Sequence, residues 1–167
     1  MLAAHEIFGF MSERLAYEIV EQLHQNDRES YKNVLAAVAE AQRVRPEFLQ
    51  RKPRAEQHRI IREWVCRPRL EAAAITLLQN WLVKIKTEML KDFLDELGIK
   101  HENGIVDELP TSVEDAKLKA AVELLLSKYP AEQVAVYLHA FNSLNQTNWP
   151  NLAQMLDADE RLQLGTG

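Results

Sequence analysis

Cysteine, glycine and proline are all scarce in this chain of 167 residues. There are five glycines, six prolines and a single cysteine, Cys66. One cysteine excludes an intrachain disulfide and any metal site built from several thiolates. Because glycine and proline are the residues that most often interrupt regular structure, their shortage favours long helices or strands over most of the sequence.

The sequence also lacks a long hydrophobic run. The longest mainly apolar and uncharged run, Ala72 to Val83, is shorter than the ~20 residues that a helix needs to span a bilayer. The first residues, MLAAHEIFGFMSERL, have no basic segment, and Glu6 interrupts their apolar character, so we expect no signal peptide. With 47% hydrophobic and 27% charged residues, the composition is typical of a globular protein. We expect a soluble cytoplasmic protein without a membrane partner.

Motifs of well-known catalytic and nucleotide-binding sites are absent. There is no glycine-rich phosphate loop, no Walker lysine and no G-x-S-x-G elbow. No two of the five histidines have the spacing of a zincin motif. We therefore expect no metal and no cofactor, and we favour a non-enzymatic protein. An enzyme or ligand-binding protein with a site assembled from several helices stays open, because such a site leaves no linear motif.

Helical periodicity is the dominant pattern of the sequence. Apolar residues recur at i, i+3, i+4 and i+7, for example at Tyr31, Val34, Leu35 and Val38, as on the buried face of a helix. This pattern predicts an all-α protein, an irregular multi-helix bundle of about seven or eight helices. We expect residues 1–164 to form a single domain and 165–167 to be a frayed tail.

Several residues mark where these helices should begin or be interrupted. Two long segments are each counted as one helix, although Gly9 allows a break near Ser12 and Gln79-Asn80 allows one in the second. Asp27 is suited to cap a helix with its carboxylate, and Thr111 or Ser112 is suited to do so with its hydroxyl, in a capping box that ends at Glu114. Asn148 is expected to cap a last helix that Trp149-Pro150 begins.

The stretch DFLDELGIKHENGIVDELP, Asp92 to Pro110, resembles a calcium loop at first sight. Aligning Gly104 with the glycine of an EF-hand places Ile99 and Pro110 where the essential carboxylates belong, which argues against calcium. Instead, Gly98 is suited to end a helix in the left-handed conformation, and Asn103-Gly104 is a strong turn signal. We predict a small β-hairpin near 99–106, or at least a tight turn, with the two halves of the bundle meeting near 98–112.

Basic residues are concentrated between Arg43 and Arg69. This segment has nine Lys and Arg but three Glu, whereas the chain as a whole has a net charge of −5. Trp64 is in phase with the apolar Ile60 and Ile61, so we expect it in the core. The candidate binding face for a polyanion or a protein partner consists of Arg51, Lys52, Arg54, Arg59, Arg62, Arg67 and Arg69.

Several interpretations of this basic face are open, and one of them is an electrostatic docking face for an acidic protein. It can bind nucleic acid without sequence preference through 43–69, because clustered cations neutralise phosphates. It can also pair with the acidic region from Asp92 to Asp115, within one chain or between two, or simply be solvated. No recognition-helix, KH or RRM signature is present.

A second candidate site is polar. Asparagines surround Trp149 in the uncharged segment FNSLNQTNWPNLAQ. The candidate residues of a polar ligand pocket are His101, His139, Asn148 and Trp149. The alternative interpretation assigns the asparagines to loop and cap positions.

The segments FLDELGIKHENG and AVYLHAFNSL, within Phe93 to Leu144, resemble a group of bacterial proteins of unknown function that are soluble and helical. The resemblance implies a bacterial cytoplasmic origin and assigns no functional residue. The leading hypothesis is a non-enzymatic helical protein-interaction module that self-associates as a homodimer.

Overall fold

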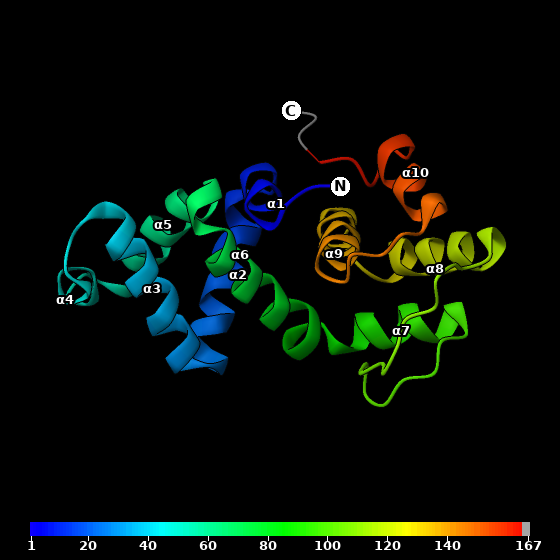
Figure 1. Cartoon of the computed structure of the whole chain (residues 1–167), viewed down its shortest axis with the longest axis horizontal. Coiled ribbons are helices and arrows are strands. Elements are labelled where there is room, and N and C mark those ends of the chain that lie inside the picture. Colours follow the sequence, from blue (N-terminus) through cyan, green and yellow to red (C-terminus); the bar gives the residue numbers. More distant parts are fainter. Residues whose placement is uncertain (165–167) are drawn as a thin grey trace. The chain divides into compact units, whose positions relative to one another are not determined.

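The computed structural model describes residues 1–164, so the expected tail at 165–167 lies outside the described residues. In the described part of the chain there are ten α-helices, one short 3-10 helix and one π-helical turn (Figure 1). The prediction of an all-α protein is confirmed. The expected number of helices was too small, because two segments that were counted as single helices are each divided in two. None of the described helices combines the length and the apolar character that crossing a membrane requires.

The chain divides into two compact units between Trp81 and Leu82. We call Leu2–Trp81 the N-terminal unit and the part that begins at Leu82 the C-terminal unit. The division falls within a π-helical turn, η2 (Asn80–Ile85), at the break that Gln79-Asn80 predicts. The two units therefore meet in the sequence at a different place from the expected 98–112.

The N-terminal unit is built from six α-helices and a 3-10 turn: α1 (Ala4–Phe10), α2 (Glu13–Asn26), α3 (Arg28–Gln42), α4 (Pro46–Gln50), α5 (Arg54–Val65), η1 (Pro68–Leu70) and α6 (Glu71–Gln79). The Ser12 hydroxyl accepts a 3.2 Å hydrogen bond from the N–H of Leu15 and starts α2. The Asp27 carboxylate accepts a 3.1 Å bond from the N–H of Ser30 and starts α3. The predicted break near Ser12 and the predicted cap at Asp27 are both confirmed.

Helices α2, α3 and α5 pack against one another and bury the apolar stripes that the sequence shows. Helix α3 ends at Arg43, whose φ of 61° turns the chain toward α4. Pro46 occupies the first turn of α4, where its missing N–H removes no hydrogen bond. Leu49 is fully buried and fixes this short helix on the body of the unit.

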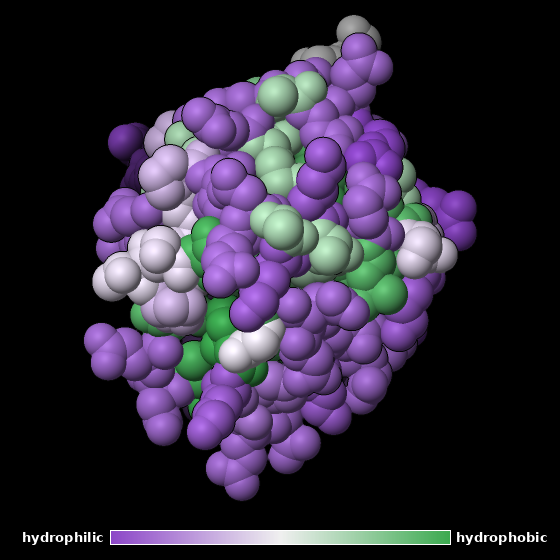
Figure 2. Space-filling view, turned by 90° about the vertical axis from the view of Figure 1, so that its right-hand side faces the viewer, coloured by the Kyte–Doolittle hydropathy of each residue, from purple (hydrophilic) through white to green (hydrophobic). Residues whose placement is uncertain are grey.

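The C-terminal unit contains four α-helices: α7 (Thr87–Leu97), α8 (Asp115–Lys128), α9 (Ala131–Leu144) and α10 (Pro150–Ala158). Helix α7 packs on α8, and α10 packs on α8 and α9. Edge-to-face contact between Phe93 and Phe141, with ring centroids 5.2 Å apart, lies in this core. The face that Figure 2 shows is mostly hydrophilic, with separate apolar side chains between the polar ones.

In the connection between α7 and α8, Gly98 and Gly104 both have the left-handed backbone conformation that the sequence predicts. Gly98 has a φ of 72°, and the N–H of Ile99 bonds back to the carbonyl of Leu94 at 3.0 Å, which ends α7 as predicted. Asn103 and Gly104 have φ values of 54° and 86°, as a tight turn requires. The expected hairpin is reduced to this turn, because it is closed by one isolated bridge between Glu102 and Ile105 rather than by two strands.

Two predicted helix caps are wrong. Helix α8 starts after Glu114 rather than after Thr111 or Ser112, and Trp149 rather than Asn148 precedes α10. The cause is a pair of long-range hydrogen bonds. The Trp149 indole donates to the carbonyl of Pro110 at 2.8 Å, and the Asn151 amide donates to that of Val113 at 2.9 Å. These bonds tie 110–113 to the start of α10, while α8 begins only at Asp115.

Candidate functional site

The middle of the basic segment is neutralised within the N-terminal unit. Arg59 lies 2.9 Å from the Glu63 carboxylate and 3.7 Å from that of Glu56 on the same helix. Arg62 pairs with Glu13 of α2 at 3.1 Å. A polyanion that followed α5 would therefore meet carboxylates as well as guanidinium groups, and the predicted basic face is not continuous.

Both ends of α5 also hold basic side chains in internal contacts. Arg54 lies 3.6 Å from Glu21 of α2. The Arg67 guanidinium stacks over the ring of Trp64 at 3.8 Å, and Trp64 is partly exposed. The expectation that Trp64 belongs to the core is therefore wrong. Arg69 is exposed in η1, at the far end of α5 from α4.

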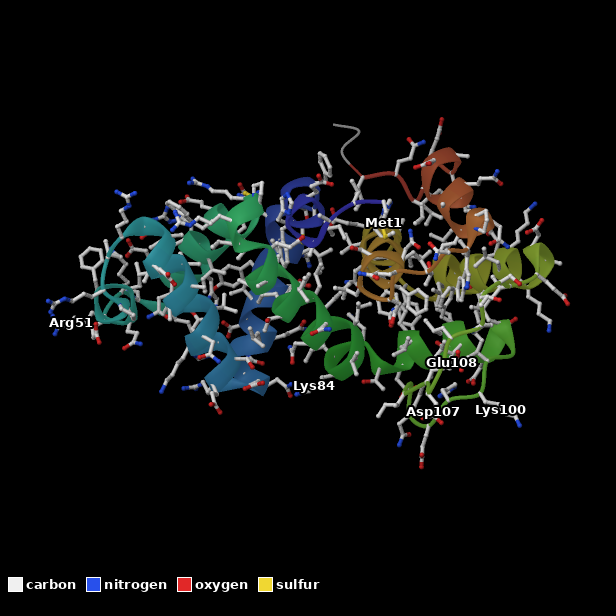
Figure 3. All side chains as sticks on the ribbon, viewed as in Figure 1. Met1, Arg51, Lys84, Lys100, Asp107 and Glu108 are labelled. Atoms are coloured by element: carbon white, nitrogen blue, oxygen red, sulfur yellow. The ribbon has the colours of Figure 1, made fainter. Side chains whose placement is uncertain are left out.

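The basic side chains around α4 have a different environment. Arg43, Arg45 and Arg51 are exposed, and no carboxylate within residues 1–164 forms an ion pair with any of the three. Phe48 lies among them in the sequence with 56% of its surface exposed, and the Lys52 ammonium is 4.8 Å from the centre of its ring. Unlike the three arginines, Lys52 has a carboxylate partner, Glu56, at 3.5 Å. Figure 3 shows Arg51 pointing outward from α4. We call Arg43, Arg45, Phe48, Arg51 and Lys52 the basic tip.

A hydrogen-bonded network lies beneath the basic tip. The side-chain amide of Gln57 donates to the backbone carbonyls of Gln50 and Lys52, at 3.0 and 2.9 Å, and so holds the turn between α4 and α5. The Gln57 carbonyl oxygen accepts a 2.9 Å hydrogen bond from the hydroxyl of Tyr31 on α3. The same hydroxyl lies 3.0 Å from Nδ1 of His58.

His58 connects this network to α2. Its Nε2 forms a short hydrogen bond with the Glu21 carboxylate, and its side chain is fully buried. Both ring nitrogens are therefore engaged by protein groups, and neither faces solvent. This geometry suits a residue that holds three helices together, and it does not suit a general base, which must reach the proton of a substrate.

Burial is the largest single influence on the pKa values of His58, Glu21 and Tyr31 in this network. Burial lowers the pKa of His58, although the hydrogen bond and the charge of Glu21 oppose this shift. Burial also raises the pKa of Glu21, but the hydrogen bonds from His58 and Gln25 and the nearby charges outweigh it, so that this pKa is lowered overall. Burial and the negative charge of Glu21 raise the pKa of the Tyr31 hydroxyl. Glu21 is thus ionised and Tyr31 protonated at neutral pH.

The residues of the expected polar pocket serve separate parts of the C-terminal unit. His101 contacts Asp95 at 2.6 Å through Nε2 and accepts a 3.0 Å hydrogen bond from the N–H of Gly104 through Nδ1. His139 is buried, and its Nε2 donates to the carbonyl of Leu162 at 2.9 Å. Trp149 is buried and bonds Pro110, while Asn148 is exposed. The hollow between the end of α7 and the start of α8 is lined by 97–100, 108–114 and Lys117, and so by none of the four.

No group of three or more His, Cys, Asp and Glu side chains within residues 1–164 is placed to hold a metal ion.

The sequence analysis missed the network, although one signal for it was present. His58, Ile61 and Val65 follow the i, i+3, i+7 spacing of one helix face, and all three are fully buried. A histidine on a buried face needs hydrogen-bond partners from neighbouring helices. Tyr31, on the apolar stripe of α3, supplies one of them.

Comparisons with family models, with curated proteins and with solved structures found no match to this chain. The resemblance of Phe93–Leu144 to bacterial proteins of unknown function stays a prediction.

Proposed function

We propose that this protein is a helical protein-interaction module that binds an acidic segment of a partner at the basic tip. The observation that supports this proposal is the group of three exposed arginines without ion pairs, Arg43, Arg45 and Arg51, which flank the exposed Phe48 in the sequence. Arginine and aromatic residues are enriched among the side chains that dominate protein interfaces. An acidic segment with an apolar side chain has both of the groups that this surface lacks.

The internal pairing of the other basic residues supports the same choice of surface. Arg59 and Arg62 already have carboxylate partners, so a new partner gains little by replacing them. The unpaired arginines of the basic tip have no such competition. Electrostatic complementarity at this surface speeds association and selects acidic partners.

Sequence-independent binding of nucleic acid through 43–69 is the alternative function. Nucleic acid would contact the same arginines, but three carboxylates lie among the basic residues of 43–69, so the positive charge is not continuous. They belong to Glu47 on α4 and to Glu56 and Glu63 on α5. Nucleic acid carries one phosphate per ~1.7 Å of duplex axis, and its binding strengthens with each phosphate that is neutralised. A short tip with three free arginines therefore suits an acidic peptide better.

Fluorescence anisotropy tests the proposal with two labelled probes. One is a synthetic peptide rich in Glu and Asp with a few Leu residues, and the other is a short single-stranded oligonucleotide. We expect the peptide to bind and the triple variant Arg43→Gln, Arg45→Gln, Arg51→Gln to lose about 3- to 100-fold in affinity, since each lost charge pair contributes about 0.2–1 kcal/mol.

A matched control removes the same charge elsewhere. The triple variant Arg14→Gln, Lys32→Gln, Arg59→Gln changes three exposed cations outside the basic tip and should bind as the wild type does. Equal loss in both triple variants would show that only net charge matters. Binding of the oligonucleotide but not the peptide at about 50 mM salt would favour the nucleic-acid function instead.

A further inference from the structure

The turn between α7 and α8 has an exposed apolar side chain flanked by negative charges, whereas the basic tip has one flanked by positive charges. Glu102, Asp107 and Glu108 are exposed, and Ile105 lies among them with 65% of its surface exposed. Within residues 1–164 none of these three carboxylates forms an ion pair. Figure 3 labels Asp107 and Glu108 on this connection. We call Glu102, Ile105, Asp107 and Glu108 the acidic turn.

The backbone of the acidic turn is well defined. Glu102 and Ile105 exchange two backbone hydrogen bonds, at 2.9 and 3.0 Å, on either side of the Asn103-Gly104 turn. The His101 ring accepts a hydrogen bond from the N–H of Gly104 and contacts Asp95 of α7, which fastens the turn to the end of that helix. Leu90 of α7 packs against Gly104, since a Cβ at this position would lie 2.9 Å from Leu90 Cδ2. A surface fixed in this way loses little conformational entropy when it binds.

We propose that a second copy of this chain is a partner of the basic tip, docked through its acidic turn. The inference rests on the proposed function, because it uses the same basic tip. Each surface has three unpaired charges that flank one exposed apolar side chain in the sequence, and the charges of the two surfaces are of opposite sign. In the contact, Phe48 of one copy and Ile105 of the other cover each other while arginines meet carboxylates at the rim. This arrangement of an apolar centre and a polar rim is usual for protein interfaces.

The contact joins two different surfaces of the chain. Two copies that use both surfaces reciprocally form a closed, isologous dimer, whereas copies joined head to tail through one contact each form a heterologous, longer assembly. The quantity to measure is therefore the appearance of any species heavier than the 19.2 kDa chain.

A charge exchange between two variants tests the inference. The tip variant carries Arg43→Glu, Arg45→Glu and Arg51→Glu, and the turn variant carries Glu102→Lys, Asp107→Lys and Glu108→Lys. All six side chains are exposed, so both variants should keep the helical circular dichroism of the wild type. In each variant alone, like charges face each other across the contact. In an equal mixture of the two, both kinds of contact again join opposite charges.

Sedimentation velocity at about 50 mM and 500 mM salt gives the readout, because screening over this range shortens the reach of exposed charges several-fold. We expect the wild type to associate at low salt and its association to weaken at high salt. Each variant alone should sediment as a monomer at low salt, and the mixture should recover the heavier species. The additional change Ile105→Ser should weaken association of the wild type at both salt concentrations.

Three results would overturn the inference. The wild type could remain monomeric at low salt, each variant alone could associate as the wild type does, or the mixture could fail to recover the heavier species. Binding of the acidic peptide separates this failure from failure of the proposed function. A monomeric wild type that binds the peptide through the basic tip refutes the second copy as partner and leaves the function intact, whereas a wild type that does neither refutes both.

Discussion

The hydroxyl of Tyr31 donates a 2.9 Å hydrogen bond to the side-chain oxygen of Gln57, and this bond links the core of the N-terminal unit to the turn that carries the basic tip. Gln57 is the connecting residue, because its amide nitrogen bonds the backbone carbonyls of Gln50 and Lys52. The surface to which we assign binding is therefore supported by a buried network that also contains His58 and Glu21.

Replacing Gln57 with leucine should loosen this turn. In the variant Gln57→Leu, the backbone carbonyls of Gln50 and Lys52 lose their hydrogen-bond donor, and the Tyr31 hydroxyl loses its acceptor. This loss should lower the free energy of unfolding by about 1–3 kcal/mol. Hydrogen exchange should become faster around α4. The control Gln154→Leu changes an exposed glutamine of α10 and should leave both measurements unchanged. Equal effects of the two substitutions would contradict the role of Gln57.

The pH dependence of stability follows from His58. Burial lowers the pKa of this histidine in the folded protein, so the unfolded chain takes up its proton first as the pH falls below the ordinary value of 6.5. The stability that neutral His58 contributes is complete above this value and is lost as the pH falls toward the folded pKa. Buried His139 and the partly buried His24 act in the same direction, because burial lowers the pKa of each.

Urea unfolding between pH 7 and pH 5 measures this effect. The free energy of unfolding should fall with decreasing pH, by up to about 1.4 kcal/mol per pH unit for each proton taken up. His58→Gln should flatten the slope and leave the contribution of His139 in place. Stability that increased toward pH 5 would contradict the assignment. Glu21 acts at lower pH, since its own pKa is lowered and its contribution is lost only below its ordinary value of 4.5.

Gly104 should tolerate no side chain. Its φ of 86° belongs to the left-handed region, and a Cβ there would lie 2.9 Å from Leu90 Cδ2. We expect Gly104→Ala to lower the unfolding free energy by about 1–2 kcal/mol. Gly9→Ala is the matched control. Gly9 lies in α1 at ordinary φ, and a Cβ there would meet Cys66 Cβ at 3.7 Å, so that substitution should stabilise by about 0.5–1 kcal/mol. Thermal unfolding of both variants measures the two changes in stability. Destabilisation by Gly9→Ala without destabilisation by Gly104→Ala would contradict the prediction.

Two neighbouring residues of α4 should separate binding from stability. Phe48 is 56% exposed and Leu49 is fully buried. Phe48→Ala should change stability by less than about 1 kcal/mol, mainly through its contact with the Lys52 ammonium, but should abolish most peptide binding. Leu49→Ala should cost about 2–5 kcal/mol, because it leaves a cavity under α4. Unchanged peptide binding by Phe48→Ala would remove Phe48 from the proposed surface.

The parts of the fold that depend on neighbouring residues were predictable. Asp27 caps α3 through a residue three positions away, and Gly98 ends α7 through its own left-handed conformation. The start of α8 was not predictable in this way. It depends on Trp149 and Asn151, which bond 110–113 from nearly forty positions further along the chain.

The candidate site shows the same limit. The concentration of charge between Arg43 and Arg69 is visible in the sequence, but the division between paired and unpaired arginines is not. Glu13 and Glu21 of α2 select Arg62 and Arg54 as partners only when the helices are packed. The arginines around α4 stay unpaired because the chain places no carboxylate against them in the described residues.

Nuclear magnetic resonance of the arginine Nε–H groups during titration with the acidic peptide tests the central claim most directly, because it locates the bound surface residue by residue. The account predicts that the signals of Arg43, Arg45 and Arg51 shift together with those of the Phe48 ring, while Arg59 and Arg62 stay unchanged in their ion pairs. Shifts centred on α5 or on the C-terminal unit, or no shifts at a peptide concentration that saturates the anisotropy signal, would contradict it.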